Sequence, residues 1–239
     1  GDFYTNDTLV ETLNSVKTRG GKVHLVGLLG DGGVHSHSKH MYALLQAAEN
    51  HKLTPIIHVI TDGRDTPPES ALGFARELEN YLTQHPGVIA SVVGRYYIMD
   101  RDKRWPRTEL GYRNVVFHEG NREADGSTRA APTLTAALEA SYRDGVTDEF
   151  VLPVALDVGT TTPGMPEMNV LIEPGDALIF FNFRADRMRQ LITAFTMPNL
   201  ETFPHAHIPN LDIVTMTNYD PNYPVKVLFP DVDITKPLA

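Results

Sequence analysis

Five arginines, Arg64, Arg95, Arg101, Arg184 and Arg187, stand closely behind three apolar runs of the sequence. Arginine binds carboxylate and phosphate groups through a planar fork of N–H donors, and each charge-assisted hydrogen bond contributes about 1.5–3 kcal/mol. The chain as a whole has a formal net charge of −9, so these cations stand out against an acidic background. Their placement predicts a site for a small, multiply anionic ligand. The alternative is that each is a surface arginine paired with a neighbouring aspartate.

A histidine accompanies the arginines. His35 stands in the stretch 30–37, Gly-Asp-Gly-Gly-Val-His-Ser-His, directly behind another apolar run. We expect it to donate a hydrogen bond to the ligand, and His37 and His40 to cap or stabilise the glycine-rich turn. The spacing of the three matches no standard zinc pattern, and no nearby carboxylate or cysteine completes a metal site. The glycines also miss the G-x-G-x-x-G pattern, which disfavours a nucleotide-dependent enzyme.

Asp65 is the carboxylate that we single out as able to exchange protons with a ligand. The competing interpretation is a helix N-cap, because Asp65 or Thr66 stands just before the Pro-Pro pair at 67–68, where a helix can begin. Asp62 can equally shape this turn. The residues by themselves favour a cap by either Asp65 or Thr66, without deciding which of the two it is.

The apolar runs alternate with segments of helical periodicity. Strands are expected at 23–29, 55–61, 88–94, 150–156, 177–183 and 211–217, and helices at 8–19, 38–50, from 67–68 onward, 107–118, 132–143 and 188–195. This alternation predicts an α/β fold with a mostly parallel central sheet and helices on both faces, in three α/β/α layers. Ligands of such sheets bind outside the carboxyl ends of the strands, which is where the candidate residues fall.

Composition excludes several classes of protein. The absence of cysteine excludes disulfides and thiolate metal sites. Runs as short as 177–181 cannot span a membrane, and an acidic chain does not suit nucleic-acid binding. The first residues form no signal peptide, so a cytoplasmic protein is expected.

Taken together, the loops resemble the inserted substrate-binding, phosphotransferase domain of the cofactor-independent (2,3-bisphosphoglycerate-independent) phosphoglycerate mutases. The matching strings are GGVHSH at 32–37, TDGRDT at 61–66, GRYY at 94–97 with MDR at 99–101, and NFRADR at 182–187. They occur in the order of the family and at compatible spacing across nearly the whole chain. Each string is a weak signal alone, and the four together are highly specific.

The resemblance implies an isomerase of glycolysis and gluconeogenesis that interconverts 3-phosphoglycerate and 2-phosphoglycerate through a phosphoserine. It implies that Arg184 and Arg187 grip the phosphoryl group, and that Arg95 and Arg101 hold the glycerate carboxylate.

Three further roles follow from the same resemblance. His35 and Arg64 would form hydrogen bonds to the glycerate oxygens. Asp65 would be the acid/base that serves the two hydroxyl groups.

The domain organisation is inferred from the same family. We expect a linker at 1–7, the substrate domain at 8–229, and a second linker at 230–239 toward a missing phosphatase-like domain. That domain would supply the serine and two divalent metal ions, manganese, magnesium or cobalt, with no cofactor or metal bound by this chain. No serine-nucleophile motif or Asp/His metal cluster is found here. The isolated domain is therefore expected to be inactive alone.

Two further expectations accompany this reading. Gly30 stands where the family often has serine, a change expected to be tolerated. Tyr4 and Ile234 should lie close together, because an inserted domain enters and leaves through neighbouring linkers. The alternative function is a stand-alone binding domain for a small phosphorylated carboxylic acid, without chemistry of its own.

Overall fold

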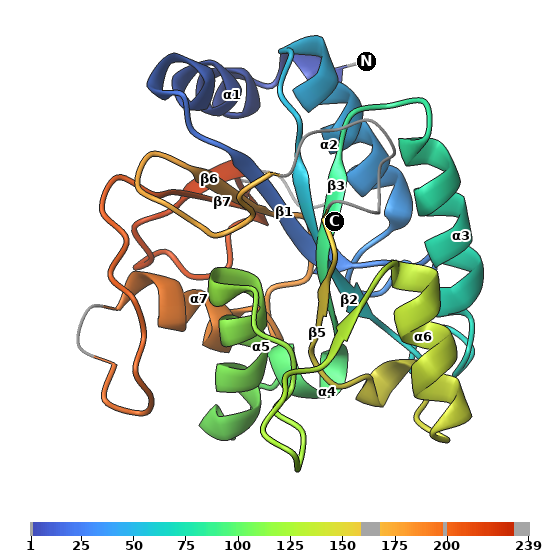
Figure 1. The fold of residues 1–239 in the computed structure, drawn as a ribbon. Helices are drawn as coiled ribbons and strands as arrows, with labels where there is room; N and C mark the ends of the chain where they lie inside the picture. The colour runs from blue at the N-terminus through green and yellow to red at the C-terminus, as the bar shows by residue number, and fades with distance from the viewer. Residues whose placement is uncertain (1, 159–167, 198–199, 232–239) are drawn as a thin grey trace, which may run out of the picture.

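Apolar runs form the three central strands β1 (Val23–Leu28), β2 (Ile56–Thr61) and β3 (Val88–Gly94), and every residue in them is buried. Burial on both faces is what a sheet covered by helices requires. The structure, a computed structural model, describes residues 2–158, 168–197 and 200–231 (Figure 1). The outer strands are β4 (Ala130–Ala131), β5 (Val154–Leu156), β6 (Ala177–Phe180), β7 (Asp212–Thr217) and β8 (Lys226–Phe229).

These strands form one sheet in the order β4-β5-β3-β2-β1-β6-β7-β8. All neighbouring pairs are parallel except β3 and β5. From β1 the chain adds β2 and β3 on one side, and it later adds β6, β7 and β8 on the other side. The loops that follow β1 and β6 therefore flank the point where the strand order reverses, which is the usual ligand crevice of such sheets.

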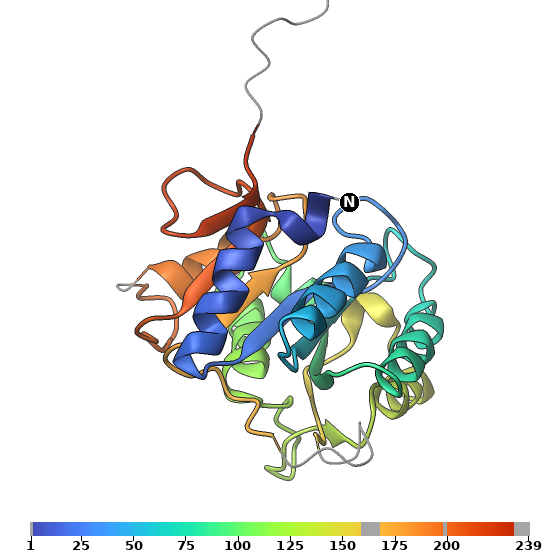
Figure 2. The same cartoon turned by 90° about the horizontal axis from the view of Figure 1, so that it is seen from above.

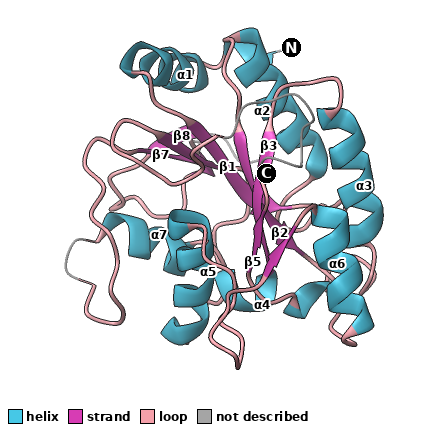
Figure 3. Cartoon of the chain, in the orientation of Figure 1, coloured by secondary structure: helices cyan, strands magenta, loops and turns pink. Residues whose placement is uncertain are grey.

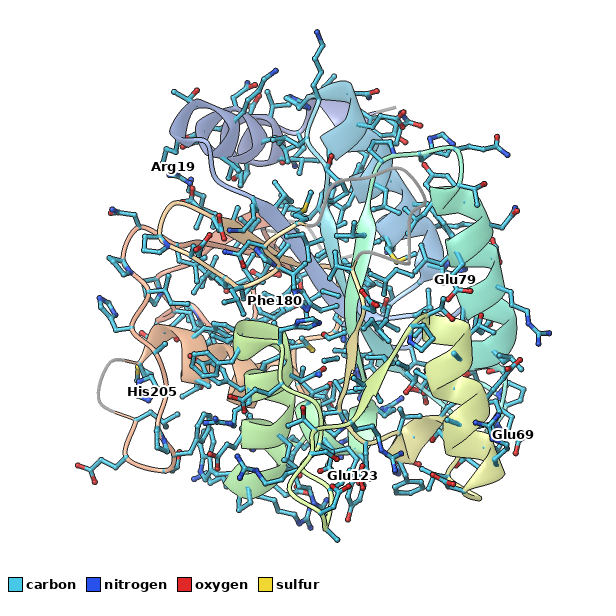
Figure 4. All side chains as sticks on the ribbon, viewed as in Figure 1. Arg19, Glu69, Glu79, Glu123, Phe180 and His205 are labelled. Atoms are coloured by element: carbon cyan, nitrogen blue, oxygen red, sulfur yellow. The ribbon has the colours of Figure 1, made fainter. Side chains whose placement is uncertain are left out.

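Helices cover both faces of this sheet (Figures 1 and 3). One face carries α1 (Asp7–Arg19), α2 (Ser38–Asn50), α3 (Ala71–Leu82) and α6 (Leu134–Arg143), which share one core cluster. The other face carries α4 (Arg95–Ile98), α5 (Trp105–Phe117) and α7 (Arg189–Thr196). Phe180 lies in the interior of this second core (Figure 4). The predicted three-layer α/β/α architecture is confirmed.

Several element boundaries differ from those expected. The Pro-Pro pair at 67–68 lies in a turn, and α3 begins only at Ala71. The Ala71 N–H donates to Asp148 Oδ2 at 2.8 Å, so the N-terminus of α3 is satisfied from a distant segment. The prediction that Asp65 or Thr66 caps this helix is therefore wrong.

The outer part of the sheet also departs from expectation. The run 150–156 contains only the three-residue strand β5, which is antiparallel to β3 and follows a 3-10 turn, Asp148–Phe150. The sequence analysis did not anticipate β4 or β8, which are short edge elements. Arg95, expected in a loop, opens the short helix α4.

The first and last described segments lie side by side (Figure 2). The Asn6 side-chain amide donates to the Leu228 carbonyl at 2.6 Å, and the rings of Phe3 and Phe229 are 5.9 Å apart. Ile234, used in the prediction about the chain ends, lies outside the described residues. Within the described ranges, none of the helices has the length and apolar character needed to cross a membrane.

Candidate functional site

The loops that follow β1, β2, β3 and β6 meet at the carboxyl edge of the sheet. The His35 carbonyl accepts hydrogen bonds from the backbone N–H groups of Phe183 at 2.9 Å and Arg184 at 3.3 Å, which joins the first and last of these loops. A Cβ at Gly32 would lie 2.8 Å from the Asp65 carbonyl oxygen, so only glycine permits the first loop to approach the second so closely.

The loop after β2 is shaped by Asp62. Its Oδ1 accepts hydrogen bonds from the backbone N–H groups of Arg64 at 3.1 Å and Asp65 at 3.0 Å. Gly63, which stands between Asp62 and Arg64, has a φ of +68°, a left-handed conformation that favours glycine. Asp62 therefore has the turn-shaping role that the sequence left open, and the turn directs Asp65 toward Arg95.

Arg95 is the buried cation of the site. Its NH1 donates to Asp62 Oδ1 at 2.7 Å and to Asp65 Oδ2 at 2.6 Å, and its side chain is only 2% exposed. Burial opposes ionisation of Asp65, but the hydrogen bond and charge of Arg95 outweigh it and lower the pKa of this carboxyl. Without ligand, Asp65 is therefore a carboxylate held in place by Arg95.

His35 lies between two carboxylates without a hydrogen bond to either. Its Nε2 is 3.8 Å from Asp65 Oδ2 and its Nδ1 is 3.7 Å from Asp186 Oδ1. Burial, followed by the charge of Arg95, lowers the pKa of His35 despite both carboxylates. The imidazole is therefore neutral near pH 7 and has one donor and one acceptor nitrogen.

Asp186 is a site residue that the sequence analysis missed. Its Oδ2 accepts from Arg101 NH1 at 2.6 Å, and its Oδ1 lies 3.0 Å from Arg184 Nε. The sequence signal was its position between two predicted arginines in NFRADR. Its contact with His35 could not be read from the sequence, because His35 belongs to another loop.

Two more arginines complete the cationic cluster. Arg187 NH1 donates to the Met99 carbonyl at 3.3 Å. Burial and then the charges of Arg101, Arg95 and Arg64 lower the pKa of Arg187, which reflects how closely these cations lie. Arg64 is exposed and its NH1 lies 3.3 Å from Glu149 Oε1.

A cavity of about 500 Å³ opens over this cluster. Its lining contains six arginines and three carboxylates, so it is cationic within an acidic chain; the lining residues are Arg64, Arg95, Tyr96, Asp100, Arg101, Asp102, Arg104, Arg107, Glu149, Phe150 and Arg187. Arg184 is not among them. Arg104 and Arg107 were not anticipated, and Arg107 stacks over the Tyr96 ring at 3.8 Å.

Both expectations for the arginines describe part of this arrangement. Arg64, Arg95, Arg101 and Arg184 each pair with a carboxylate, as the surface-residue alternative supposed. The structure nevertheless brings them to one edge of the sheet instead of scattering them. A ligand with carboxylate and phosphoryl groups can exchange with these internal carboxylates for the same donors.

The other two histidines have structural surroundings. His37 Nδ1 accepts from the Lys39 N–H at 3.2 Å and caps α2, as expected. The His40 ring packs edge-on against Phe183, with centroids 5.7 Å apart. Among the described residues, no group of three or more histidines and carboxylates could hold a metal ion.

Comparisons with known proteins bear on the whole chain. Residues 1–221 match the family model described as BPG-independent PGAM N-terminus. The chain is 43% identical to the 2,3-bisphosphoglycerate-independent phosphoglycerate mutase of Thermosynechococcus vestitus, over 98% of this chain and 41% of the relative. It is also 43% identical to that of Chloroflexus aurantiacus, over 100% of this chain and 46% of the relative.

A solved structure of Leishmania mexicana phosphoglycerate mutase at low cobalt concentration is similar, with a TM-score of 0.81 and 29% identity. The match covers 96% of this chain and 42% of that one. The chain thus spans less than half the length of these relatives. The family match, the relatives and the shared fold agree, and the chain belongs to the BPG-independent phosphoglycerate mutases, in the region described as their N-terminus.

Proposed function

We propose that this chain is the substrate-binding and phosphoryl-transfer domain of an enzyme that interconverts 3-phosphoglycerate and 2-phosphoglycerate. The observation that carries the proposal is the cationic cavity beside Asp65, in a chain whose net charge is −9. Phosphoglycerate carries a carboxylate and a phosphoryl group on three carbons, so it matches a small cavity lined by separate arginines.

Binding would use the arginines in two groups. Arg95 and Arg101 would hold the carboxylate, and Arg184 and Arg187 would hold the phosphoryl group. Both hydrogen bonds of Arg95 to carboxylates come from NH1, so the other N–H groups of its fork can face a ligand. Phosphoryl transfer depends mainly on positioning and charge stabilisation, which such a cluster provides.

Asp65 would move the protons, while His35 and Arg64 hold the glycerate oxygens. A bound trianion adds negative charge beside Asp65 and competes with it for Arg95, so the pKa of Asp65 rises on binding. The protonated Asp65 gives its proton to the ester oxygen that loses the phosphoryl group, so that this oxygen becomes a hydroxyl. The resulting carboxylate takes the proton of the other hydroxyl when that oxygen accepts the phosphoryl group.

The remaining parts of the enzyme would lie outside this chain. A phosphatase-like domain would supply the serine that carries the phosphoryl group, and two divalent metal ions, with manganese, magnesium or cobalt as candidates. The described residues here offer no metal site, so no step is assigned to a metal within this chain. The contact of Asn6 with Leu228 supports insertion into such a domain, because the first and last described segments lie side by side. The expected location is the cytoplasm.

Binding of 3-phosphoglycerate to this chain tests the proposal. Trp105 opens α5 next to Arg104 of the cavity, so its fluorescence should report the titration. Binding should be weak, because half of the site is absent, and it should weaken further with salt. Arg101→Ala should reduce the affinity by about tenfold or more, because a charge-assisted contact is lost.

Arg76→Ala is the matched control. Arg76 also pairs with a carboxylate, Glu139, but it lies on α3 away from the cavity. Its affinity for 3-phosphoglycerate should be unchanged. Tight binding of an adenine or nicotinamide nucleotide, with none of phosphoglycerate, would contradict the proposal. Binding with no mutase activity in the full-length gene product would favour the stand-alone binding domain.

A further inference from the structure

Asp186 contacts three functional side chains that come from different loops. Its Oδ2 is 2.6 Å from Arg101 NH1, and its Oδ1 is 3.0 Å from Arg184 Nε and 3.7 Å from His35 Nδ1. Under the proposed function, Arg101 and Arg184 bind opposite ends of the ligand. Asp186 therefore connects the two ends of the site, whereas the ion pairs that Asp65 forms among the described residues are with Arg95 and His35, which are both buried.

Two buried atoms at this point, His35 Nδ1 and Asp186 Oδ1, form no hydrogen bond and lie 3.7 Å apart, although Asp186 Oδ1 is also ion-paired with Arg184 Nε at 3.0 Å. Buried polar atoms are nearly always paired, so such exceptions mark places where a small movement or a ligand completes the contact. The gap of 3.7 Å exceeds a hydrogen bond by less than 1 Å. A slight movement of either side chain closes it.

The two carboxylates beside His35 differ in how strongly they are already neutralised. Asp65 is hydrogen bonded to Arg95, which is buried. Asp186 is shared by Arg101 and Arg184, which are about half exposed, so water screens their charge. Asp186 is therefore the better acceptor for a proton on His35 Nδ1. The lone pair of Nε2 then faces the side of Asp65, where it accepts a hydrogen bond from a ligand hydroxyl, instead of donating one to the ligand as the sequence analysis expected.

We propose that Asp186 is a positioning residue that places the proton of neutral His35 on Nδ1 and holds Arg101 and Arg184 at a fixed separation. The first effect fixes the hydrogen-bonding direction of His35. The second effect keeps the carboxylate and phosphoryl ends of the ligand in register. The inference rests on the proposed function only for the identity of the ligand.

Nitrogen NMR of histidine-labelled protein tests the first effect without any ligand. Near neutral pH, His35 in the unsubstituted chain should carry its proton on Nδ1, and in Asp186→Asn the proton should move to Nε2 toward Asp65. A loss of packing alone would not exchange the two nitrogens. His35→Gln assigns the signal. A proton on Nε2 in the unsubstituted chain would overturn the proposal, even if the variant failed to fold.

Binding of two anions tests the second effect. Asp186→Asn removes a carboxylate that competes for both arginines, so inorganic phosphate should bind as tightly as before or more tightly. Affinity for 3-phosphoglycerate should fall by about tenfold or more, because it requires two correctly spaced arginines and an oriented His35. Asp186→Glu should restore part of this preference. Equal loss for both anions, or no change in their ratio, would overturn the proposal.

Asp212→Asn is the matched control. Asp212 also bridges two cations, Arg19 at 2.6 Å and Lys226 at 3.0 Å, and it is similarly buried. It begins β7, at the amino ends of the parallel strands, and it pairs with Arg19, which is labelled in Figure 4. The His35 proton and the ratio of affinities should be unchanged in this variant. Failure of the unsubstituted chain to bind 3-phosphoglycerate would refute the proposed function, while the NMR result would still decide the role of Asp186.

Discussion

Two polar clusters at opposite ends of the same strands use similar side chains in different ways. The amino-end chain consists of Asp176, His24, His58 and Ser91, and all four are buried. Its contacts are hydrogen bonds, His24–Asp176 at 3.2 Å, His24–His58 at 3.0 Å and His58–Ser91 at 2.9 Å. Because ionised Asp176 can only accept, the donors run in one direction, from Ser91 through both histidines to Asp176.

The carboxyl-end cluster consists of Asp65, Arg95, Asp186 and His35. His35 is as buried as His24 and His58, and burial lowers the pKa of all three. The difference is in the contacts, because the two carboxylates facing His35 are 3.7 and 3.8 Å away. Burial and a lowered pKa therefore do not distinguish His35, which we propose binds the ligand, from His24 and His58. What distinguishes these three histidines is that the protein supplies hydrogen-bond partners to the rings of His24 and His58, whereas His35 Nδ1 has none.

The substitution with the largest expected effect removes the proton-exchanging group of the carboxyl-end cluster, Asp65. In the full-length enzyme, Asp65→Asn keeps the shape of the side chain but cannot exchange a proton. Turnover should fall roughly 10²–10⁴-fold, while affinity for phosphoglycerate changes little. Steady-state mutase kinetics with a direct binding titration measure both quantities. Near-normal turnover would remove Asp65 from the mechanism.

The substitution with the next largest expected effect removes Asp176 from the amino-end chain. Asp176 also accepts hydrogen bonds from the backbone N–H groups of Lys22 at 2.7 Å and Glu173 at 2.8 Å. Asp176→Ala leaves these donors and His24 unpaired, so unfolding should become easier by about 3 kcal/mol. Urea denaturation measures this loss. Binding of 3-phosphoglycerate to the folded fraction should not change, and a parallel loss of binding would show that the two ends are coupled.

Replacing His35 at the carboxyl end sharpens the comparison. His35→Gln should reduce affinity for 3-phosphoglycerate by about tenfold, because one hydrogen bond to the ligand is lost. Its free energy of unfolding should change by less than about 1 kcal/mol, since the ring has no hydrogen bond to lose. His85→Gln, at a partly buried histidine paired with Glu49, controls for loss of an imidazole. A large loss of stability in His35→Gln would contradict this distinction.

The smallest effect concerns pH. The pKa values of His24 and His58 are lowered by burial, so the unfolded chain binds protons that the folded chain rejects. Stability should therefore fall as pH decreases below about 6.5, by about 1.4 kcal/mol per pH unit for each proton. Asp148 acts in the opposite direction, because burial raises its pKa to about 6 and the folded chain retains its proton.

His58→Gln removes one of the two side chains that we expect to bind a proton in the unfolded chain but not in the folded chain. The dependence of its unfolding free energy on pH should be shallower than that of the unsubstituted chain, by about one proton. Urea denaturation at several pH values on either side of 6.5 measures the slope. An unchanged slope would mean that His58 does not titrate differently in the two states.

The central strands could be predicted from the sequence because they are buried on both faces. The long apolar runs at β1, β2 and β3 identify these segments as buried strands without reference to the rest of the chain. The position of the arginines at the ligand-binding edge follows from the rule that ligands of parallel sheets bind at the carboxyl ends of the strands. The start of α3 could not be predicted, because its cap comes from Asp148, 77 residues away. The four-residue strand β8 was missed because its pairing partner β7, not its composition, decides its state.

The site was predicted unevenly for the same reason. Residue type and position were enough to select Arg95 and Asp65 as candidates. The buried gap between His35 and Asp186 depends on how two loops meet in space, and no local pattern encodes it. Asp186 also looked like an ordinary counter-ion for its neighbours in the sequence.

The contact between the two chain ends has a mechanical consequence. A force that pulls residues 3 and 229 apart acts first on the Asn6–Leu228 hydrogen bond and the Phe3–Phe229 contact. These contacts join the segment just before α1 to β8, which is an edge strand, so the central strands carry no load until the contacts separate. The contact between the two chain ends would therefore break before the rest of the fold. A pulling force on the flanking chain would be released at this junction before it deformed the pocket.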